Sequence, residues 1–153
     1  MSLKRNLAEE LHKPKRRNYQ TSRVVIKGIL TDLWQADLCD LRMYPDKGFK
    51  YLLVIIDVGS KKAWARALKS KSGEDVSKAL SSVFKSSKLT PKHLQVDRGR
   101  EFYNPQVLEL LKKKKVNMYS TFTELKASIV ERLNRTLKQW MWTEFSVEGN
   151  RKW

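Results

Sequence analysis

The pattern of apolar and polar positions predicts three strands in the first half of the chain. Apolar residues alternate with others over 33–41 and 62–68, which is typical of strands. The segment 49–57 contains an unbroken apolar run, as in a central strand that is buried on both faces. A turn signature at Pro45–Gly48 separates the first two segments. We therefore expect a three-stranded antiparallel meander.

Two helices and two further strands are expected after the meander. Ser72 is a good N-cap and is followed by acidic residues, so a helix is predicted to start there. Asn104 and Pro105 open a second helix in the same way. Short strands are predicted at 93–97 and 116–119. Together with a last helix, this order predicts an α/β fold: a five-stranded mixed sheet flanked by helices on both faces.

The last predicted helix, from about residue 123 to Phe145, has two different faces. Residues three, four and seven positions apart share a helix face. The face suited to burial consists of Val130, Leu133, Leu137, Trp140 and Met141. A different face carries Glu131, Asn134, Arg135 and Lys138. We expect the helix to pack into the core by its apolar face and to present a carboxylate, an amide and two cations on the other.

The two ends of the chain differ from the region between them. Residues 1–30 hold a short predicted helix at 3–11 and then a basic run, which we interpret as an N-terminal arm or linker. Residues 31–146 form the predicted globular domain. Residues 147–153 are interpreted as the start of a truncated C-terminal segment, with a further helix beginning at 150–153.

The net charge of the chain indicates which kind of molecule it binds. Its 153 residues include 32 Lys and Arg against 16 Asp and Glu, a net charge of +16. Such an excess favours a polyanionic partner, nucleic acid first and an anionic membrane surface second. Membrane spanning is not expected, because no apolar run approaches the roughly 20 residues that a bilayer requires. The N-terminus also lacks the apolar region of a secretory signal.

Three carboxylates are placed where such a sheet can gather them. Asp37 lies within the first strand, Asp97 at the end of the fourth, and Glu131 on the polar face of the last helix. Ligands tend to bind at strand ends in α/β sheets, and grouped carboxylates repel one another unless a cation neutralises them. Oxygen ligands suit Mg²⁺ or Mn²⁺, and two such ions about 4 Å apart serve phosphoryl transfer. This combination favours a nuclease or polynucleotidyl transferase.

Each carboxylate also has an ordinary structural explanation. Asp97 precedes an Arg-Gly pair and could be a turn aspartate. Asp37 could belong to an alternating surface pattern, with Asp40 or Asp57 as the functional acid instead. Glu131 could form a solvated ion pair with the arginine four residues on, worth about 0.3 kcal/mol. Their joint placement is what favours a shared site.

Four ordered motifs resemble the catalytic core of retroviral-type integrases. They are Trp34–Asp37, Val54–Ser60, Val96–Phe102 and Val130–Lys138, within a resemblance that extends over about 33–145. The resemblance implies an RNase H-like fold. It also implies that Asp37, Asp97 and Glu131 are the catalytic and metal-binding residues, with two Mg²⁺ (or Mn²⁺) ions expected during catalysis.

The same resemblance implies a function in DNA integration. DNA contacts are expected from Arg100, Lys126, Asn134, Arg135 and Lys138. The implied reaction is 3′-end processing of transposon ends and strand transfer into target DNA, in the nucleus, by a homodimer or higher homo-oligomer. Details around 10–14 and 126–131 are most similar to Polinton/Maverick DNA-transposon integrases. The alternatives are a catalytically inactive or domesticated core that binds nucleic acid, and an RNase H-type nuclease.

Overall fold

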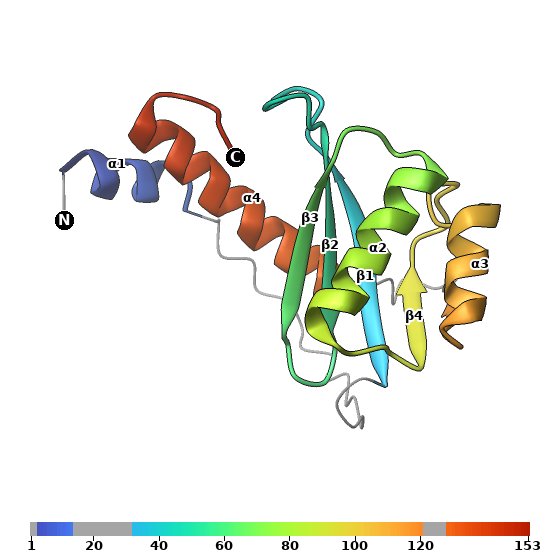
Figure 1. Cartoon of the computed structure of the whole chain (residues 1–153). Helices are drawn as coiled ribbons and strands as arrows, with labels where there is room; N and C mark the ends of the chain where they lie inside the picture. Colours follow the sequence, from blue (N-terminus) through green and yellow to red (C-terminus); the bar gives the residue numbers. More distant parts are fainter. Residues whose placement is uncertain (1–2, 14–31, 121–127) are drawn as a thin grey trace.

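The computed structural model describes residues 3–13, 32–120 and 128–153, and its elements follow the predicted order (Figure 1). They are α1 (Leu3–Leu11), β1 (Leu33–Asp40), β2 (Tyr51–Asp57), β3 (Ala63–Leu68), α2 (Gly73–Ser87), β4 (His93–Val96), α3 (Pro105–Lys113), β5 (Asn117–Tyr119) and α4 (Ser128–Glu148). The short N-terminal helix is confirmed as α1. The basic run that follows it lies largely outside the described residues.

The five strands form one mixed sheet in the order β3-β2-β1-β4-β5. β1, β2 and β3 pair antiparallel, which confirms the meander, while β4 pairs parallel with β1 and β5 with β4. Ala36 of β1 lies opposite Val96 of β4. The residues that follow them, Asp37 and Asp97, therefore come at the same level on neighbouring strands.

The alternation along β1 divides its side chains between the two faces of the sheet. Trp34 and Ala36 belong to the larger core, which α2 and α3 cover. Gln35, Asp37 and Cys39 face the opposite layer, where α4 lies over β1 and β2 (Figure 1). The predicted five-stranded mixed sheet with helices on both faces is confirmed.

The helices α2 and α3 begin where their capping residues predict. The Oγ of Ser72 accepts a hydrogen bond from the backbone N–H of Asp75 at 3.2 Å, and the Oδ1 of Asn104 accepts one from Val107 at 3.0 Å. A cap of this kind is worth about 1 kcal/mol. The buried stripe of α2 consists of Val76, Ala79, Leu80, Val83 and Phe84. Each large side chain in it contributes roughly 1.5–3 kcal/mol by burial, which fixes α2 on the sheet.

The apolar face of α4 is only partly as predicted. Val130 is fully buried and Leu133 and Leu137 pack on the sheet, but Trp140 is 61% exposed. The reason is that the C-terminal half of α4 runs past the sheet and packs beside α1 instead (Figure 1). The guanidinium of Arg5 donates two hydrogen bonds to Glu144 there. Among the described helices, none is long and apolar enough to cross a membrane.

The prediction that a second helix begins at 150–153 is wrong. Gly149, at φ +69, ends α4 in the left-handed conformation that glycine adopts readily, and the chain then folds back as a loop. The indole Nε1 of Trp153 donates to the carbonyl of Tyr44 at 2.7 Å, and Arg151 lies over the Tyr44 ring at 4.9 Å. The end of the chain is therefore attached to the hairpin between β1 and β2, and α4 itself extends to Glu148.

Candidate active site

Asp37 is held between its own strand and α4. Its Oδ1 accepts a hydrogen bond from the backbone N–H of Leu38 at 2.8 Å, and its Oδ2 accepts one from the Nδ2 of Asn134. Asn134 is buried, at 6% exposed, while Asp37 is half-buried. Both carboxylate oxygens are thus fixed by donors on two elements that are 97 residues apart in the chain.

Asp97 lies beside Asp37 at the end of β4. Burial raises the pKa of Asp37, the hydrogen bond from Leu38 lowers it, and the negative charge of Asp97 raises it further. The hydrogen bond from Asn134 and the positive charge of Lys138 oppose that rise. The net direction of the pKa is upward, because burial and the like charge of Asp97 outweigh the two hydrogen bonds and the charge of Lys138.

The loop that follows Asp97 is anchored where it joins α3. Phe102 is 1% exposed and belongs to the larger core. The Nδ2 of Asn104 donates to the carbonyl of Glu101 at 2.7 Å, while its Oδ1 caps α3. Arg100, the predicted DNA contact, projects into solvent from this anchored loop. Its exposure suits phosphate contact, because a free guanidinium can form bidentate hydrogen bonds.

Cys39 continues the packing between β1 and α4, and the charge of Lys138 acts on it. Lys138 lies one turn beyond Asn134 and is half-buried. Burial raises the pKa of the Cys39 thiol to about 11, although the positive charge of Lys138 acts in the opposite direction. A buried thiol with such a pKa is unreactive at neutral pH. Cys39 is therefore a packing residue in this layer.

The third predicted carboxylate, Glu131, is exposed on α4, one turn before Asn134. In residues 3–13, 32–120 and 128–153, no three His, Cys, Asp or Glu side chains lie close enough together to hold a metal ion. The structure thus brings Asp37 and Asp97 together and leaves Glu131 separate from them.

The donor set around Asp37 still fits a divalent cation. The Oδ1 of Asn134 is buried without a hydrogen-bond donor from the described residues. Two carboxylates and an unpaired amide oxygen are hard oxygen donors of the kind that Mg²⁺ and Mn²⁺ prefer. The free oxygen also suits a hydrogen bond from metal-bound water. The residues present therefore fit such an ion in chemistry, with Glu131 on the neighbouring turn.

The other predicted DNA contacts differ in exposure. Arg135 is exposed and Lys138 half-buried, so both have charge available at the surface of α4. Asn134 is buried and uses its amide on Asp37. Lys126 lies outside the described residues.

The two alternative acids both have structural partners. The carboxylate of Asp40 pairs with Arg42 at 2.6 Å on the surface. Asp57 is 1% exposed and accepts a hydrogen bond from the backbone N–H of Gly59 at 2.9 Å, at the turn into β3. Asp37, in contrast, lies beside Asp97, and that neighbour favours it as the functional acid.

Two functional candidates were absent from the sequence-based set: the buried glutamines Gln35 and Gln95. The Nε2 of Gln35 donates to the Oε1 of Gln95 at 3.0 Å, and the Oε1 of Gln35 accepts from the backbone N–H of Val130 at 3.1 Å. The available signal was a glutamine with an apolar residue on each side in both strands, between Trp34 and Ala36 and between Leu94 and Val96. Buried polar groups normally require such partners.

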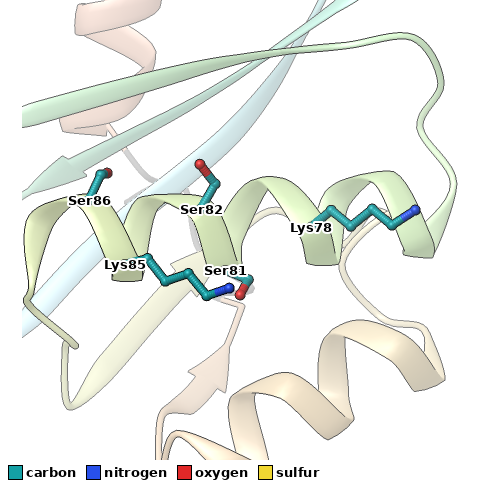
Figure 2. A pocket seen from close by; sticks show the side chains of 5 residues that line it. All are labelled: Lys78, Ser81, Ser82, Lys85 and Ser86. Atoms are coloured by element: carbon teal, nitrogen blue, oxygen red, sulfur yellow. The ribbon is translucent and has the colours of Figure 1, made fainter.

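A separate polar hollow lies on the outer side of α2, across the sheet from α4 (Figure 2). It has a volume of about 530 Å³ and is lined by Lys78, Ser81, Ser82, Lys85 and Ser86. The guanidinium of Arg66 donates to Ser82 and Ser86 beside it. The candidate carboxylates take no part in this hollow.

Residues 31–121 match the family described as the integrase core domain. The chain is 44% identical over 106 residues to an uncharacterized transposon-derived protein of Caenorhabditis elegans, a match that covers 69% of this chain and 37% of that protein. The chain thus spans little more than a third of the length of this curated relative.

Two solved structures are similar in fold. The HTLV-2 integrase catalytic core domain, in complex with magnesium and in dimeric form, has a TM-score of 0.63 at 19% identity, over 76% of this chain and 74% of that one. A chain of the simian T-cell lymphotropic virus intasome, in complex with the PP2A regulatory subunit B56 gamma, has a TM-score of 0.70 at 18% identity, over 90% and 49%. These likenesses show an RNase H-like integrase fold. Because the family match covers more than half of its length, the chain belongs to the integrase core domain family.

Proposed function

We propose that this chain is the catalytic core of an integrase or transposase that processes DNA 3′ ends and joins them to target DNA. The observation that carries the proposal is the placement of Asp37, hydrogen-bonded by Asn134, beside Asp97 at the end of β4. Membership of the integrase core domain family and the similarity to a transposon-derived protein support it. The finer resemblance to Polinton/Maverick integrases is part of the proposal.

In this proposal, Asp37, Asp97 and Glu131 hold two Mg²⁺ or Mn²⁺ ions. When bound, such ions supply Lewis-acid stabilisation and a more acidic hydroxyl nucleophile. Asn134 keeps the Asp37 carboxylate oriented, and its free Oδ1 accepts a hydrogen bond from a water in the site. A structural neighbour that contains magnesium supports the choice of metal.

The proposed reaction has two displacements at phosphorus. Water first cleaves a phosphodiester near the transposon end and releases a 3′-hydroxyl. That hydroxyl then attacks a target phosphodiester, forms a new P–O bond and displaces a target 3′-hydroxyl. The exposed cations Arg100 and Arg135, with Lys126 and Lys138, contact the phosphates of the two DNA segments in this proposal.

The biological setting follows from the substrate. An enzyme that joins transposon DNA to chromosomal DNA acts in the nucleus in eukaryotes, so we propose a nuclear location. We also propose a homodimer or higher homo-oligomer as the acting form, because two DNA ends have to be joined together. The dimeric form of one structural neighbour and the intasome source of the other support this choice.

A strand-transfer assay tests the proposal. The protein is incubated with a labelled duplex end and a plasmid target in Mg²⁺ or Mn²⁺, and joined products are counted. Asp97→Asn keeps the side-chain size and should abolish joining. Asp40→Asn, which alters an exposed aspartate paired with Arg42, is the matched control and should retain activity. Joining by Asp97→Asn at the wild-type rate would show that the triad assignment is wrong.

A second candidate function is binding of nucleic acid without catalysis. The observation that favours it is the separation of the exposed Glu131 from the other two carboxylates. Calorimetric Mg²⁺ binding distinguishes the two functions: a catalytic core binds Mg²⁺ and loses that binding in Glu131→Gln, whereas a binding module shows neither effect. An RNase H-type nuclease would instead cleave RNA–DNA hybrids without forming joined products.

A further inference from the structure

Two successive hydrogen bonds join β1 to α4, and a buried side chain continues the series. The Oε1 of Gln35 accepts a hydrogen bond from Val130 at 3.1 Å, and Asp37 accepts one from Asn134. The series continues at Cys39, which is buried in the layer between β1 and α4, and the positive charge of Lys138 acts on its thiol. The contacts use every second residue of the strand and every fourth residue of the helix. We call this series the β1–α4 ladder.

The spacing of the ladder follows from backbone geometry. Two residues of a strand advance about 6.8 Å, and four residues of a helix advance about 6.0 Å. Every second strand residue points to the same face, and every fourth helix residue lies on the same side. The strand and the helix therefore stay in step over this length, so fixing the first hydrogen bond sets the position of the helix along the strand.

The first contact is built from buried groups. Gln35 is 5% exposed and Gln95 is 6% exposed. The Nε2 of Gln35 donates to the Oε1 of Gln95 at 3.0 Å, so the other end of the Gln35 amide, its acceptor Oε1, is directed at α4. Two neighbouring strands thus define the orientation of a single amide.

The group that this amide holds is at the start of α4. The helix begins at Ser128, so the backbone N–H of Val130 lies in the first turn, where no preceding helical carbonyl is available. Gln35 supplies the acceptor from a strand 95 residues earlier in the chain. It acts as an N-cap provided by the sheet. Glu131 is the next residue on the helix.

We propose that Gln35, oriented by Gln95, is a positioning residue that fixes the first turn of α4 and thereby sets where Glu131 lies relative to Asp37 and Asp97. Gln35 acts through the Val130 backbone and touches neither metal nor DNA. The role of Glu131 as a metal ligand rests on the proposed function. The anchoring of the helix turn rests on the hydrogen bonds alone.

The first test measures amide hydrogen exchange by NMR on the full chain in metal-free buffer. Gln35→Leu removes the acceptor and replaces the amide by an apolar side chain of similar volume. Exchange at Val130 and Glu131 should become roughly tenfold faster, because a buried hydrogen bond that protects the turn is lost. Amides in β2 and α2 should be unchanged. Gln106→Leu, at an exposed position on α3, is the matched control and should leave exchange at 130–131 as in the wild type.

The second test measures Mg²⁺ affinity by calorimetry for the same variants. Gln35→Leu should bind Mg²⁺ severalfold more weakly, and Gln106→Leu should bind it like the wild type. Gln35→Met keeps the length of the side chain without an acceptor oxygen and should behave like Gln35→Leu. If Gln35→Leu does not fold, Gln35→Met replaces it in both tests.

Two results would overturn the inference. Unchanged exchange at Val130 and Glu131 in Gln35→Leu and Gln35→Met would show that the amide does not anchor the turn. Faster exchange with unchanged Mg²⁺ affinity would show that Gln35 is structural and does not position Glu131. Failure of the proposed function would give a different result. The wild-type protein would then neither bind Mg²⁺ nor join DNA, while the difference in exchange between the wild type and Gln35→Leu would persist.

Discussion

Replacing Asp37 by Asn should abolish DNA joining and at the same time stabilise the protein at neutral pH. Burial and the neighbouring Asp97 raise the pKa of Asp37 above its ordinary value in the folded state. A group with a raised folded pKa favours folding while it is protonated, and that contribution is lost as pH rises through the folded pKa. At pH 7 the ionised carboxylate therefore opposes folding, and a neutral amide of similar size removes this opposition.

The structure indicates the size of the gain. An Asn at this position can still accept from the Leu38 N–H, and its own amide N–H₂ can donate to the free Oδ1 of Asn134 after rotation of the Asn134 amide. The Nδ2 of Asn134 then takes the place of its Oδ1, so the variant has one buried amide atom without a partner among the described residues, as the wild type has. After allowance for solvent screening of this half-exposed group, we expect a gain of about 1 kcal/mol in the free energy of unfolding. For a domain of this length, that corresponds to about 3 °C in Tm.

The assay is thermal unfolding by circular dichroism in EDTA, from about pH 8 down to about pH 4. The advantage of Asp37→Asn should shrink as pH falls, since the wild-type carboxylate becomes protonated too. Asp40 lies on the same strand, and its replacement should change the stability in the opposite direction, because its hydrogen bonds with Arg42 lower its pKa. That contribution is present above the unfolded pKa and is lost as pH falls, so Asp40→Asn should be less stable than wild type at neutral pH. A less stable Asp37→Asn, or a pH-independent difference, would refute the reasoning.

Three further predictions concern other parts of the molecule. Asn134→Ala removes a hydrogen bond to a charged group, worth about 1.5–3 kcal/mol, so strand transfer should fall roughly 10- to 150-fold in single-turnover kinetics; an unchanged rate would contradict the role of Asn134. Trp153→Ala removes the contact with Tyr44, so limited proteolysis should cut the β1–β2 hairpin faster, with cleavage elsewhere as the internal control. DNA affinity measured by fluorescence anisotropy should fall with salt at a logarithmic slope of about −0.9 per neutralised phosphate, and Arg135→Gln should reduce that slope by about one; an equal slope would exclude Arg135 from phosphate contact.

Much of the fold was predictable because local signals and tertiary environment agree. The alternation along β1 placed Asp37 on a defined face, and the caps Ser72 and Asn104 started their helices as expected. For these features, the physical cause is local and can be read from the sequence pattern. The expected proximity of Asp37 and Asp97 depends on the parallel pairing of β1 with β4, which the sequence pattern did not specify.

The sequence-based predictions failed where a feature depends on contacts between elements that are distant in the chain. Helical periodicity put Trp140 on the apolar face, but periodicity does not say how far the sheet beneath a helix extends. The last residues carried no pattern that indicated attachment to Tyr44. The buried amides of Gln35 and Gln95 are satisfied by elements distant in sequence, so their importance becomes visible only when β1, β4 and α4 are assembled.

The buried thiol of Cys39 gives the chain a built-in chemical reporter. The sequence contains one cysteine, and its side chain lies in the layer between β1 and α4. While α4 is docked, burial keeps the thiol protonated and out of reach of aqueous reagents. Its rate of modification by a maleimide or disulfide reagent therefore measures how often α4 lifts from the sheet. No label has to be introduced, and the same reading can be taken with metal, with DNA or with neither.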